Sequence, residues 1–507
     1  PTDRRVAGRE VMARAEMLAL SSKDDDSDLT VSRRLLERGV QLVQRLLIDR
    51  VGLLGTVEGY HPDRTVHLVA DVFHGDLRSS VCAPANTSGG HRVASQPSAV
   101  FGPERTREYA RRMARLDFRA FDADNHYYEA EDAFTRHIDP SMAKRCMQWA
   151  EVGGKKRLLV GGRVNKFIPN PTFDPIARPG SLEDYFRGRN TEGLDLATMF
   201  GDLDPISEHP EFRNPTARLA VMDDQGLESA FLFPTLGVGM QEALKHDIPA
   251  LQAAFTAFNS WLDEDWGFDR DGRLFAAPML TLADPDSAVA EIDRVLSMGA
   301  RIVVMVPGPV PTDDGYRSPG MADYDPAWAR LQEARVPVAF HAGLSGTGQY
   351  AKVWESGTGQ FEAFRHSAFP LVAFTDRSIS DTFAALICHG VLDRFPELQL
   401  VSIENGGMWV PELFRHLTAA HGKMPFAFPS HPVERFLASV WVSPYFEDDM
   451  PLLKDLLGVD RLLFGSDFPH AEGLSEPLNF VDELEGFSDD EVRKVMRDNA
   501  YRLVGAN

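Results

Sequence analysis

The stretch "FRAFDADNHYYEAED", residues 118–132, decides how this chain is interpreted. An apolar run leads into Asp122, Asp124 and His126, which stand at every second position. Alternate residues of a β-strand project from the same face, so we expect these three side chains to point the same way. The pattern has two interpretations: a metal site at the end of a strand, or the solvated polar end of an ordinary strand.

Further apolar segments of strand-like composition follow, and amphipathic helical stretches separate most of them. One helix is predicted after Asp284 as N-cap, with Pro285 at its first position and Gly299 at its end. Short strands that alternate with helices in this way predict a (β/α)8 TIM barrel, with a doubly wound parallel sheet as the alternative. The eight predicted strands cover residues 118–124, 229–235, 274–280, 301–307, 336–342, 398–404, 439–445 and 461–467.

Two connections are longer than the ~2 to 6 residues usual between strand and helix. The first is an insertion of residues 129–214, which contains a predicted hairpin around Gly161 and Gly162. The second covers residues 343–376. They follow the first and the fifth strand, and loops after strands lie at the end of a barrel where active sites occur. We therefore expect both insertions to act as lids.

The first hundred residues differ from the rest, because acidic and basic residues balance there. Apolar residues at helical spacing predict a helix within residues 28–55, and a segment rich in Ser, Gly, Pro and Ala predicts a linker at 82–100. Residues 1–100 are thus an N-terminal extension without an assigned function, and residues 116–507 form the predicted barrel.

Composition excludes several classes of protein. A formal net charge of -22 argues against nucleic-acid binding, which needs a basic surface. The 3 cysteines are too few for a disulfide framework, and no run of ~20 apolar residues predicts a membrane span. We expect a cytoplasmic enzyme that acts on a small molecule, with no membrane or nucleic-acid partner and a homodimer as its assembly.

Residues typical of metal sites stand at the ends of three predicted strands. Asp124 and His126 end the first, His341 the fifth and Asp467 the eighth. Alone, His341 has an ordinary structural interpretation and Asp467 is a common turn residue. Because the carboxyl ends of barrel strands meet at one rim, we expect the four side chains to hold one divalent ion. Two imidazoles and two carboxylates suit Zn²⁺ first, with Mn²⁺ or Fe²⁺ as alternatives.

The chain contains five motifs: "FDADNHYYEAED" (121–132), "VAFHAG" (338–343), "GVLDRFPELQLVSIENGGMWVPELFRHL" (390–417), "LLFGSDFPHAEG" (462–473) and "FSDDEVRKVMRDNAYRLVG" (487–505). Together these motifs resemble the amidohydrolase-related branch of the amidohydrolase superfamily, which contains metal-dependent hydrolases and nonoxidative decarboxylases similar to aminocarboxymuconate semialdehyde and γ-resorcylate decarboxylases. The resemblance implies a barrel with one metal, and it places the family's metal ligands on Asp124, His126, His341 and Asp467. The family's first ligand is usually His, but a carboxylate, as in Asp124, often takes its place in the decarboxylases.

The sixth strand departs from the family pattern. Many relatives place a catalytic His after it, whereas this chain has Glu404 and Asn405. Glu404 is therefore predicted to transfer a proton or to support a metal ligand, and a purely structural carboxylate is the alternative. The other candidates for substrate binding are Arg163, His389, Asn405 and His470.

The residues favour a metal-dependent hydrolase in which Asp467 acts as the base for a metal-activated water. A metal-dependent nonoxidative decarboxylase of a small unsaturated or aromatic acid uses the same ligands and is the first alternative. The second is a catalytically inactive barrel with a binding role, which the missing sixth-strand His suggests. Fold and ligands by themselves do not decide the reaction.

Overall fold

The computed structural model describes residues 116–346, 350, 353–354 and 368–505. The helix predicted within residues 28–55 and the linker predicted at 82–100 lie outside these residues. All that follows concerns the described part of the chain.

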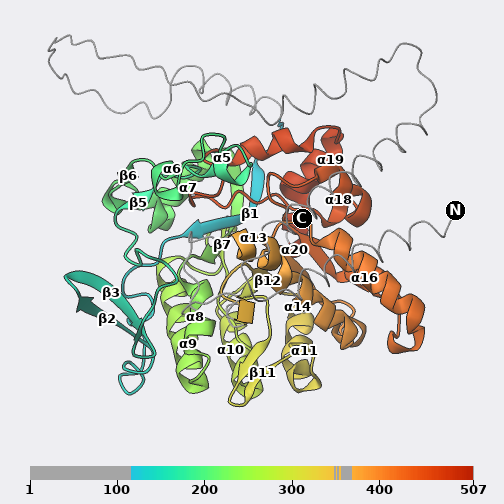
Figure 1. The fold of residues 1–507 in the computed structure, drawn as a ribbon, viewed down its shortest axis with the longest axis horizontal. Coiled ribbons are helices and arrows are strands. Elements are labelled where there is room, and N and C mark those ends of the chain that lie inside the picture. Colours follow the sequence, from blue (N-terminus) through green and yellow to red (C-terminus); the bar gives the residue numbers. More distant parts are fainter. Residues whose placement is uncertain (1–115, 347–349, 351–352, 355–367, 506–507) are drawn as a thin grey trace, which may run out of the picture. The chain divides into compact units, whose positions relative to one another are not determined.

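Seven of the predicted strands form two parallel sheets (Figure 1). The first sheet has the order β1-β7-β8 and the second the order β14-β13-β12-β9. Every pairing within them is parallel, as expected of strands joined through helices. The strands are β1 (Ala120–Tyr127), β7 (Leu227–Pro234), β8 (Leu274–Ala276), β9 (Val303–Met305), β12 (Val338–His341), β13 (Leu400–Ile403) and β14 (Val440–Val442).

Single parallel bridges continue the strand order at the edges of the two sheets. Met279 pairs with Val304, which links β8 to β9. At the other edges, Val442 pairs with Leu462 and Asn125 pairs with Phe468. The segment around residues 462–468 thus lies between β14 and β1, in the order expected of a (β/α)8 fold.

The strand predicted at 461–467 is wrong as a regular strand. Its pairing is broken because the Ser466 amide donates to the Asp122 carboxylate, 2.9 Å away, instead of to a neighbouring backbone. Asp467 then adopts φ 56°, which is outside the extended region. The segment still lies close to β1, because a Cβ added to Gly465 would come within 2.6 Å of the Asp124 Cβ.

The strands are buried on both faces. All eight residues of β1 are buried, including its acidic ones. A parallel strand covered on both sides is expected to bury every position. Between the strands, the Phe121 ring lies 4.8 Å from that of Phe231 and 5.8 Å from that of Phe275. Tyr501, from the last helix, packs against Phe121 at 4.9 Å and so ties the C-terminus to the core.

Helices connect successive strands and lie beside them (Figure 1). The predicted signals of one helix are confirmed: Asp284 accepts a hydrogen bond from Ser287 N, Pro285 is the first residue, and Gly299 has φ 97° just past the end. The longer helices are α7 (Pro215–Asp224), α9 (Ile248–Asp265), α10 (Pro285–Ser297), α11 (Asp325–Ala334), α14 (Arg377–Cys388), α16 (Val410–Lys423), α17 (Pro432–Ser439) and α18 (Met450–Leu457). Shorter ones are α5 (Glu183–Phe186), α6 (Leu196–Met199), α8 (Met240–Leu244), α13 (Ala368–Phe374), α15 (Val391–Arg394), α19 (Asp489–Arg493) and α20 (Asn499–Leu503).

The first insertion contains small antiparallel sheets. The predicted hairpin is confirmed, since Val160 pairs with Arg163 across Gly161 and Gly162. The strands of this insertion are β2 (Met147–Val152), β3 (Lys155–Val160), β4 (Arg163–Val164), β5 (Ile176–Ala177) and β6 (Leu203–Asp204). β2 joins the hairpin by pairing with β3, and β5 pairs with β6. One more antiparallel pair, β10 (Val310–Thr312) and β11 (Gly315–Arg317), follows β9 and lies outside the insertion.

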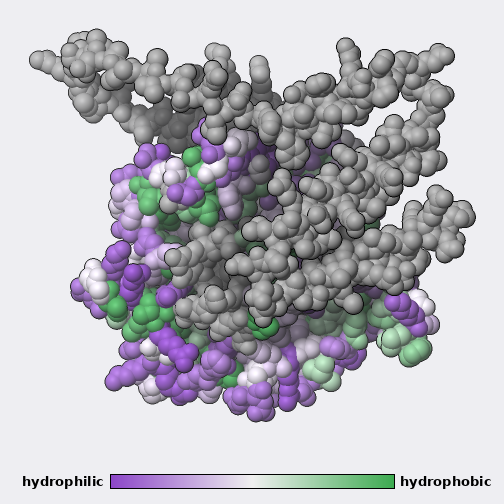
Figure 2. Space-filling view, in the orientation of Figure 1, coloured by the Kyte–Doolittle hydropathy of each residue, from purple (hydrophilic) through white to green (hydrophobic). Residues whose placement is uncertain are grey.

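The described surface is mixed in character. Figure 2 shows hydrophilic side chains over much of the visible part, with hydrophobic ones scattered between them. Within the described part, we find no helix of sufficient length and apolar character to cross a bilayer.

Candidate metal centre

A bulge in β1 sets the directions of the first two candidate ligands, Asp124 and His126. Between Asp122 and Asn125 the pairing of β1 with β7 shifts register. Such bulges redirect side chains and are common beside active sites. Both candidate side chains are buried, and His126 Nε2 lies 3.3 Å from Asp124 Oδ1. Asp122, which precedes the bulge, is not among these ligands and accepts a hydrogen bond from Asn125 Nδ2.

His341, the last residue of β12, brings a second imidazole to the same place. Its Nδ1 lies 2.9 Å from the carbonyl oxygen of Ala342. A carbonyl accepts but does not donate, so Nδ1 carries the hydrogen and Nε2 of the neutral ring presents its lone pair. That Nε2 lies 3.2 Å from His126 Nε2 and 3.6 Å from Asp124 Oδ1. Both rings therefore direct an Nε2 atom at one point.

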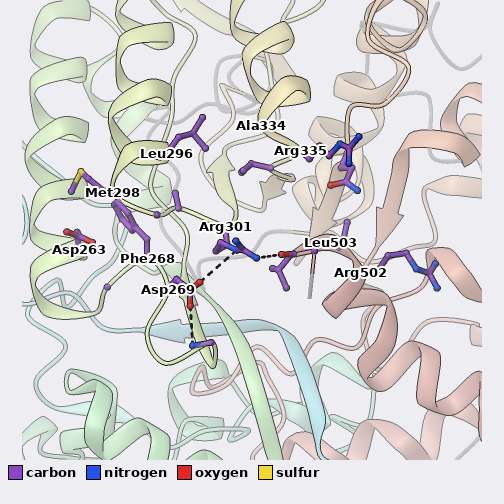
Figure 3. A pocket seen from close by; sticks show the side chains of 18 of the residues that line it. Asp263, Phe268, Asp269, Leu296, Met298, Arg301, Ala334, Arg335, Arg502 and Leu503 are labelled. Carbon is purple, nitrogen blue, oxygen red and sulfur yellow. Dashed lines mark hydrogen bonds and ion pairs between the residues drawn. The ribbon is translucent and has the colours of Figure 1, made fainter. Parts of the chain in front are cut away.

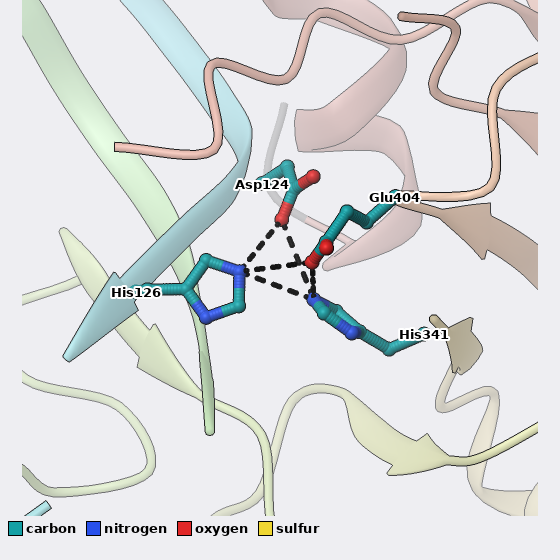
Figure 4. Close-up of side chains that lie close together, drawn as sticks. All are labelled: Asp124, His126, His341 and Glu404. Atoms are coloured by element: carbon teal, nitrogen blue, oxygen red, sulfur yellow. Dashed lines mark hydrogen bonds and ion pairs between the residues drawn. The ribbon is translucent and has the colours of Figure 1, made fainter. Parts of the chain in front are cut away.

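Glu404, just after β13, completes the group (Figure 4). Its Oε2 is 3.1 Å from His341 Nε2 and 3.5 Å from His126 Nε2. The backbone of Glu404 has φ 53°, a conformation that costs energy for a residue other than glycine and that clusters at functional sites. The Tyr445 hydroxyl donates to the Glu404 carbonyl at 2.8 Å and holds this turn. The structure thus places the Glu404 carboxylate among the candidate ligands themselves.

The spacing within this group fits a metal ion. Donor atoms about 2.0 to 2.2 Å from one ion lie about 2.8 to 3.6 Å from one another in octahedral or tetrahedral arrangements. The measured separations in the group run from 3.1 to 3.6 Å. Asp124 Oδ1 is buried and has no hydrogen-bond partner, which suits an atom that binds a cation. The four residues Asp124, His126, His341 and Glu404 are therefore a possible metal site.

The electrostatics of the group also favour a cation. Burial by itself lowers the pKa of His126, but the neighbouring carboxylates of Asp124 and Glu404 outweigh burial and raise the pKa to about 9. Burial raises the pKa of Asp467 well above its usual range, and the nearby charge of Glu404 adds to this. Carboxylates crowded in a buried place need positive charge, which protons or a metal ion supply.

Asp467 lies at the edge of the group. Its amide donates to the Asp124 carbonyl at 2.8 Å, and its backbone has φ 56°. Its Oδ1 is 3.3 Å from His126 Nε2, near enough to be a further ligand. The same Oδ1 lies 2.6 Å from His470 Nδ1, which is a hydrogen-bond distance.

His470 lies beside Asp467, and Thr235 fixes its ring. The Thr235 hydroxyl donates to the Tyr127 carbonyl at 2.8 Å and lies 2.9 Å from His470 Nε2. The single hydroxyl hydrogen goes to the carbonyl, so Thr235 must accept a hydrogen bond from Nε2–H. His470 Nδ1 then faces Asp467 Oδ1, and their short contact requires one proton between them.

Asp122 supports the site from behind, as an acid that is not a ligand. It is 0% exposed, and its carboxylate accepts hydrogen bonds from the backbone of Asp124, the side chain of Asn125 and both the amide and hydroxyl of Ser466. Burial raises its pKa to about 6, although these donors oppose the shift.

Three other predicted residues lie elsewhere. Asn405 follows Glu404, but its amide donates to the carbonyls of Phe340 and Ile403, which is a structural role. His389 is exposed at the end of α14, with Nδ1 2.7 Å from Ser318 Oγ. Arg163 is exposed on β4. The structure does not bring His389 or Arg163 into the group of candidate ligands.

Sequence reasoning missed two residues of this region, Thr235 and Glu472. Thr235 carries no motif, and only the fold shows that its hydroxyl holds His470. Glu472 stands two residues after His470, so the run "DFPHAEG" contained a signal for it. Burial raises the pKa of Glu472 to about 7, with a contribution from the Glu404 charge, and its Oε2 is buried without a hydrogen-bond partner.

A cleft lies at the opposite end of the strands (Figure 3). It has a volume of about 1160 Å³ and is lined by residues that precede β8, β9, β12 and β13, such as Phe268, Arg301 and Arg335. Catalytic sites of such folds lie at the carboxyl ends of strands. The metal group, not this cleft, is therefore the candidate active site.

Comparison with known proteins agrees with this geometry. The family described as "Amidohydrolase" matches residues 121–506. A crystal structure of the amidohydrolase map2389c from Mycobacterium avium subsp. paratuberculosis K-10 is 49% identical, with a TM-score of 0.73, and covers 77% of this chain and 100% of that one. Relatives of this kind imply a TIM barrel for this chain.

Curated relatives include decarboxylases. Gamma-resorcylate decarboxylase of Rhizobium sp. (strain MTP-10005) is 24% identical over 341 residues, which is 64% of this chain and 97% of that protein. Decarboxylase orsB of Emericella nidulans is 25% identical over 299 residues, 53% of this chain and 86% of that protein. The match of the family over most of the described residues is decisive, and the chain belongs to the amidohydrolase family.

Proposed function

We propose that this protein is a metal-dependent nonoxidative decarboxylase that acts on a small aromatic acid with a hydroxyl group beside its carboxylate. The observation that carries the proposal is the group of two facing imidazole Nε2 atoms and two carboxylates, beside the hydrogen-bonded pair of Asp467 and His470. Similarity to gamma-resorcylate decarboxylase supports the reaction class and the kind of substrate.

The ion would be held by Asp124, His126, His341 and Glu404. Asp467 would lie beside the ion as a further metal ligand. When bound, a divalent ion supplies positive charge that fixes the substrate's carboxylate and adjacent oxygen. A set of carboxylates and imidazoles suits Mn²⁺ or Fe²⁺ as well as Zn²⁺. Metal analysis of the purified protein identifies the ion.

Asp467 is the proposed proton donor. In one state of the Asp467 and His470 pair, the shared proton resides on Asp467 Oδ1. Asp467 gives this proton to the ring carbon that carries the carboxylate. The bond between ring and carboxylate then breaks, its electron pair restores the aromatic ring, and carbon dioxide leaves. Each turnover consumes one proton, which returns to Asp467 from water.

The closure of the barrel and the role of a lid are part of the same proposal. We place the site at the carboxyl end of a closed (β/α)8 barrel, with the insertion at 129–214 as a lid. Much of the second predicted lid, 343–376, lies outside the described residues. The bridges of Leu462 and Phe468 to β14 and β1 support closure. A lid excludes water, which strengthens the electrostatic interactions on which proton transfer depends.

The test compares two isomeric acids with the metal-loaded protein. 2,6-Dihydroxybenzoate has a hydroxyl beside its carboxylate, and 3,5-dihydroxybenzoate has none. We expect resorcinol and carbon dioxide in equal amounts from the first acid and no turnover of the second. If neither acid releases carbon dioxide, from protein shown to contain one metal per chain, the proposed substrate class is wrong.

A metal-dependent hydrolase is the second candidate. It is supported by the 3.3 Å separation of Asp467 Oδ1 from His126 Nε2, which places a carboxylate where it can accept a proton from water beside the metal group. Turnover of aryl esters, amides or lactones without carbon dioxide release identifies this activity. A protein that takes up neither Zn²⁺ nor Mn²⁺ contradicts both enzyme functions and favours a binding role.

A further inference from the structure

A guanidinium group is buried behind the metal group. Arg218, on α7, is 0% exposed, and its Nη2 has no hydrogen-bond partner. No carboxylate of the described residues forms an ion pair with it. Its charge lies instead near the faces of Phe468 and Trp266, at 5.4 and 5.9 Å from the ring centres. A buried charge without an ionic partner is costly, so its place in the structure needs an explanation.

The side-chain amide of Asn125 connects the Arg218 guanidinium to the Asp122 carboxylate by a path of hydrogen bonds. Arg218 Nη1 donates to Asn125 Oδ1, and Asn125 Nδ2 donates to Asp122 Oδ2 at 2.9 Å. Arg218 Nε donates to the Glu211 carbonyl at 3.0 Å, which fixes the other side of the group. The Asn125 amide therefore has its oxygen toward the cation and its nitrogen toward the carboxylate, the orientation that both charges favour.

Asp122 accepts hydrogen bonds from two segments of the chain that carry candidate ligands. Asp122 Oδ1 accepts from Asp124 N at 3.1 Å and from Ser466 N at 2.9 Å. The first amide belongs to a candidate ligand, and the second precedes Asp467. One carboxylate thus fixes the backbone of β1 and of the segment that ends in Asp467, at the point where Asp467 N donates to the Asp124 carbonyl.

We infer that Arg218 is a positioning residue for the metal group and acts through Asn125 and Asp122. The inference rests on the proposed function, because it takes this group as a metal site. The cation orients the Asn125 amide, the amide orients the Asp122 carboxylate, and the carboxylate sets the backbone of Asp124 and Ser466. Partners of this kind, one step behind the ligands, commonly affect metal affinity.

The test measures metal affinity, independently of turnover. Full-length wild type and Arg218→Met are stripped of metal and titrated with Mn²⁺ and with Zn²⁺ by calorimetry. We expect Arg218→Met to bind about 10- to 100-fold more weakly. Arg218→Lys keeps the charge but lacks the planar fork, so it should recover part of the affinity. Arg213→Met is the matched control, because Arg213 donates to carbonyls of Tyr128, Glu129 and Thr172 but not to this path.

Folding is checked in parallel by thermal unfolding with and without metal. If Arg218→Met does not fold, Asn125→Ala replaces it, since that change breaks the same path and leaves both charges in place. Affinity equal to wild type in the folded variant overturns the inference, while the proposed function stands. An equal loss of metal affinity in Arg213→Met also overturns the inference, because the loss then follows from the removal of any arginine in this region. Wild type that binds no metal overturns both.

Discussion

Glu404 of the metal group and Asp467 at its edge have left-handed backbones, with φ of 53° and 56°. Each follows a core segment, and each turns its carboxylate toward the imidazole of His126. Side chains other than glycine rarely adopt this backbone, because Cβ approaches the neighbouring carbonyl oxygen. Strain of this kind persists where the surroundings impose it, and here the hydroxyl of Tyr445 and the amide contact with Asp124 do so.

Asp467→Asn tests the proposed acid. Asparagine has the same shape and tolerates the left-handed backbone, so the fold should remain intact. Loss of a general acid costs about 10²- to 10⁴-fold in rate, and we expect kcat to fall in this range. The measurement is kcat for carbon dioxide release at equal metal content. Full activity in the variant would contradict the assignment, and Asp449→Asn, at the start of α18, is a matched control.

The strain at Glu404 predicts an order of stability. In the metal-free protein, Glu404→Gly and Glu404→Ala both remove the carboxylate, but only glycine adopts φ near 53° without strain. We expect the glycine variant to be more stable by about 1 kcal/mol in its free energy of unfolding, measured with urea. An alanine variant of equal or greater stability would show that this turn relaxes when the side chain is removed.

At the scale of elements, the metal group is assembled from strand ends and held by connections between them. β1 supplies two candidate ligands, β12 one, and the turn after β13 one. The segment of residues 462–468 forms three backbone hydrogen bonds with β1, through the carbonyls of Phe464 and Phe468 and the amide of Asp467. The bulge in β1 separates Asp122, which supports this segment, from the ligands.

Helix α19, near the C-terminus, begins with a capping box. We expect this capping box to make the free energy of unfolding depend on pH. Ser488 accepts from Glu491 N, Glu491 Oε2 accepts from Ser488 N, and Lys454 of α18 pairs with Glu491 at 2.6 Å. The hydrogen bond from Lys454, followed by that from Ser488 N, lowers the pKa of Glu491 to about 2. The folded pKa is below the unfolded value of 4.5, so the stabilisation is complete above pH 4.5 and is lost as the pH falls toward 2.

Glu491→Gln should therefore lower the free energy of unfolding at pH 7 but have little effect near pH 2. Asp489→Asn removes a charge in the same turn without a capping role and serves as the control. Ser488→Ala removes the other half of the box and should cost about 1 kcal/mol. An equal effect of Glu491→Gln at both pH values would rule out the ionic part of this explanation.

For the whole molecule, the motifs of the family and the candidate ligands all lie within residues 121–506. A chain from which residues 1–100 are deleted should fold and bind metal, because the family match and the candidate ligands lie beyond them. The measurements are thermal unfolding and metal titration against the full-length chain. Aggregation of the shortened chain, or loss of metal affinity, would show that the N-terminal extension stabilises the rest.

The sequence by itself determined the order of strands and the first candidate ligands. Apolar segments between helix caps such as Asp284 predict parallel strands, because hydrophobic periodicity is a local property. Asp124, His126 and His341 were visible because strand ends in this fold meet at one rim. The same reasoning placed His470 near Asp467, since the two are close in sequence. The prediction of a regular eighth strand was wrong. The Ser466 amide donates to the side chain of Asp122, and a hydrogen bond between residues so far apart in the chain leaves no local signal in the sequence.

The tertiary structure alone decided which polar residues act together. Glu404 became a candidate ligand only when β13 brought its carboxylate to 3.1 Å from His341 Nε2. His389 looked equally suitable by residue type, but it lies at the end of α14, hydrogen-bonded to Ser318. Thr235 and Arg218 had no sequence signal, because a hydroxyl or guanidinium gains its role from the acceptor opposite it. Local pattern specifies secondary structure, whereas donor–acceptor pairing across distant segments depends on how the chain packs.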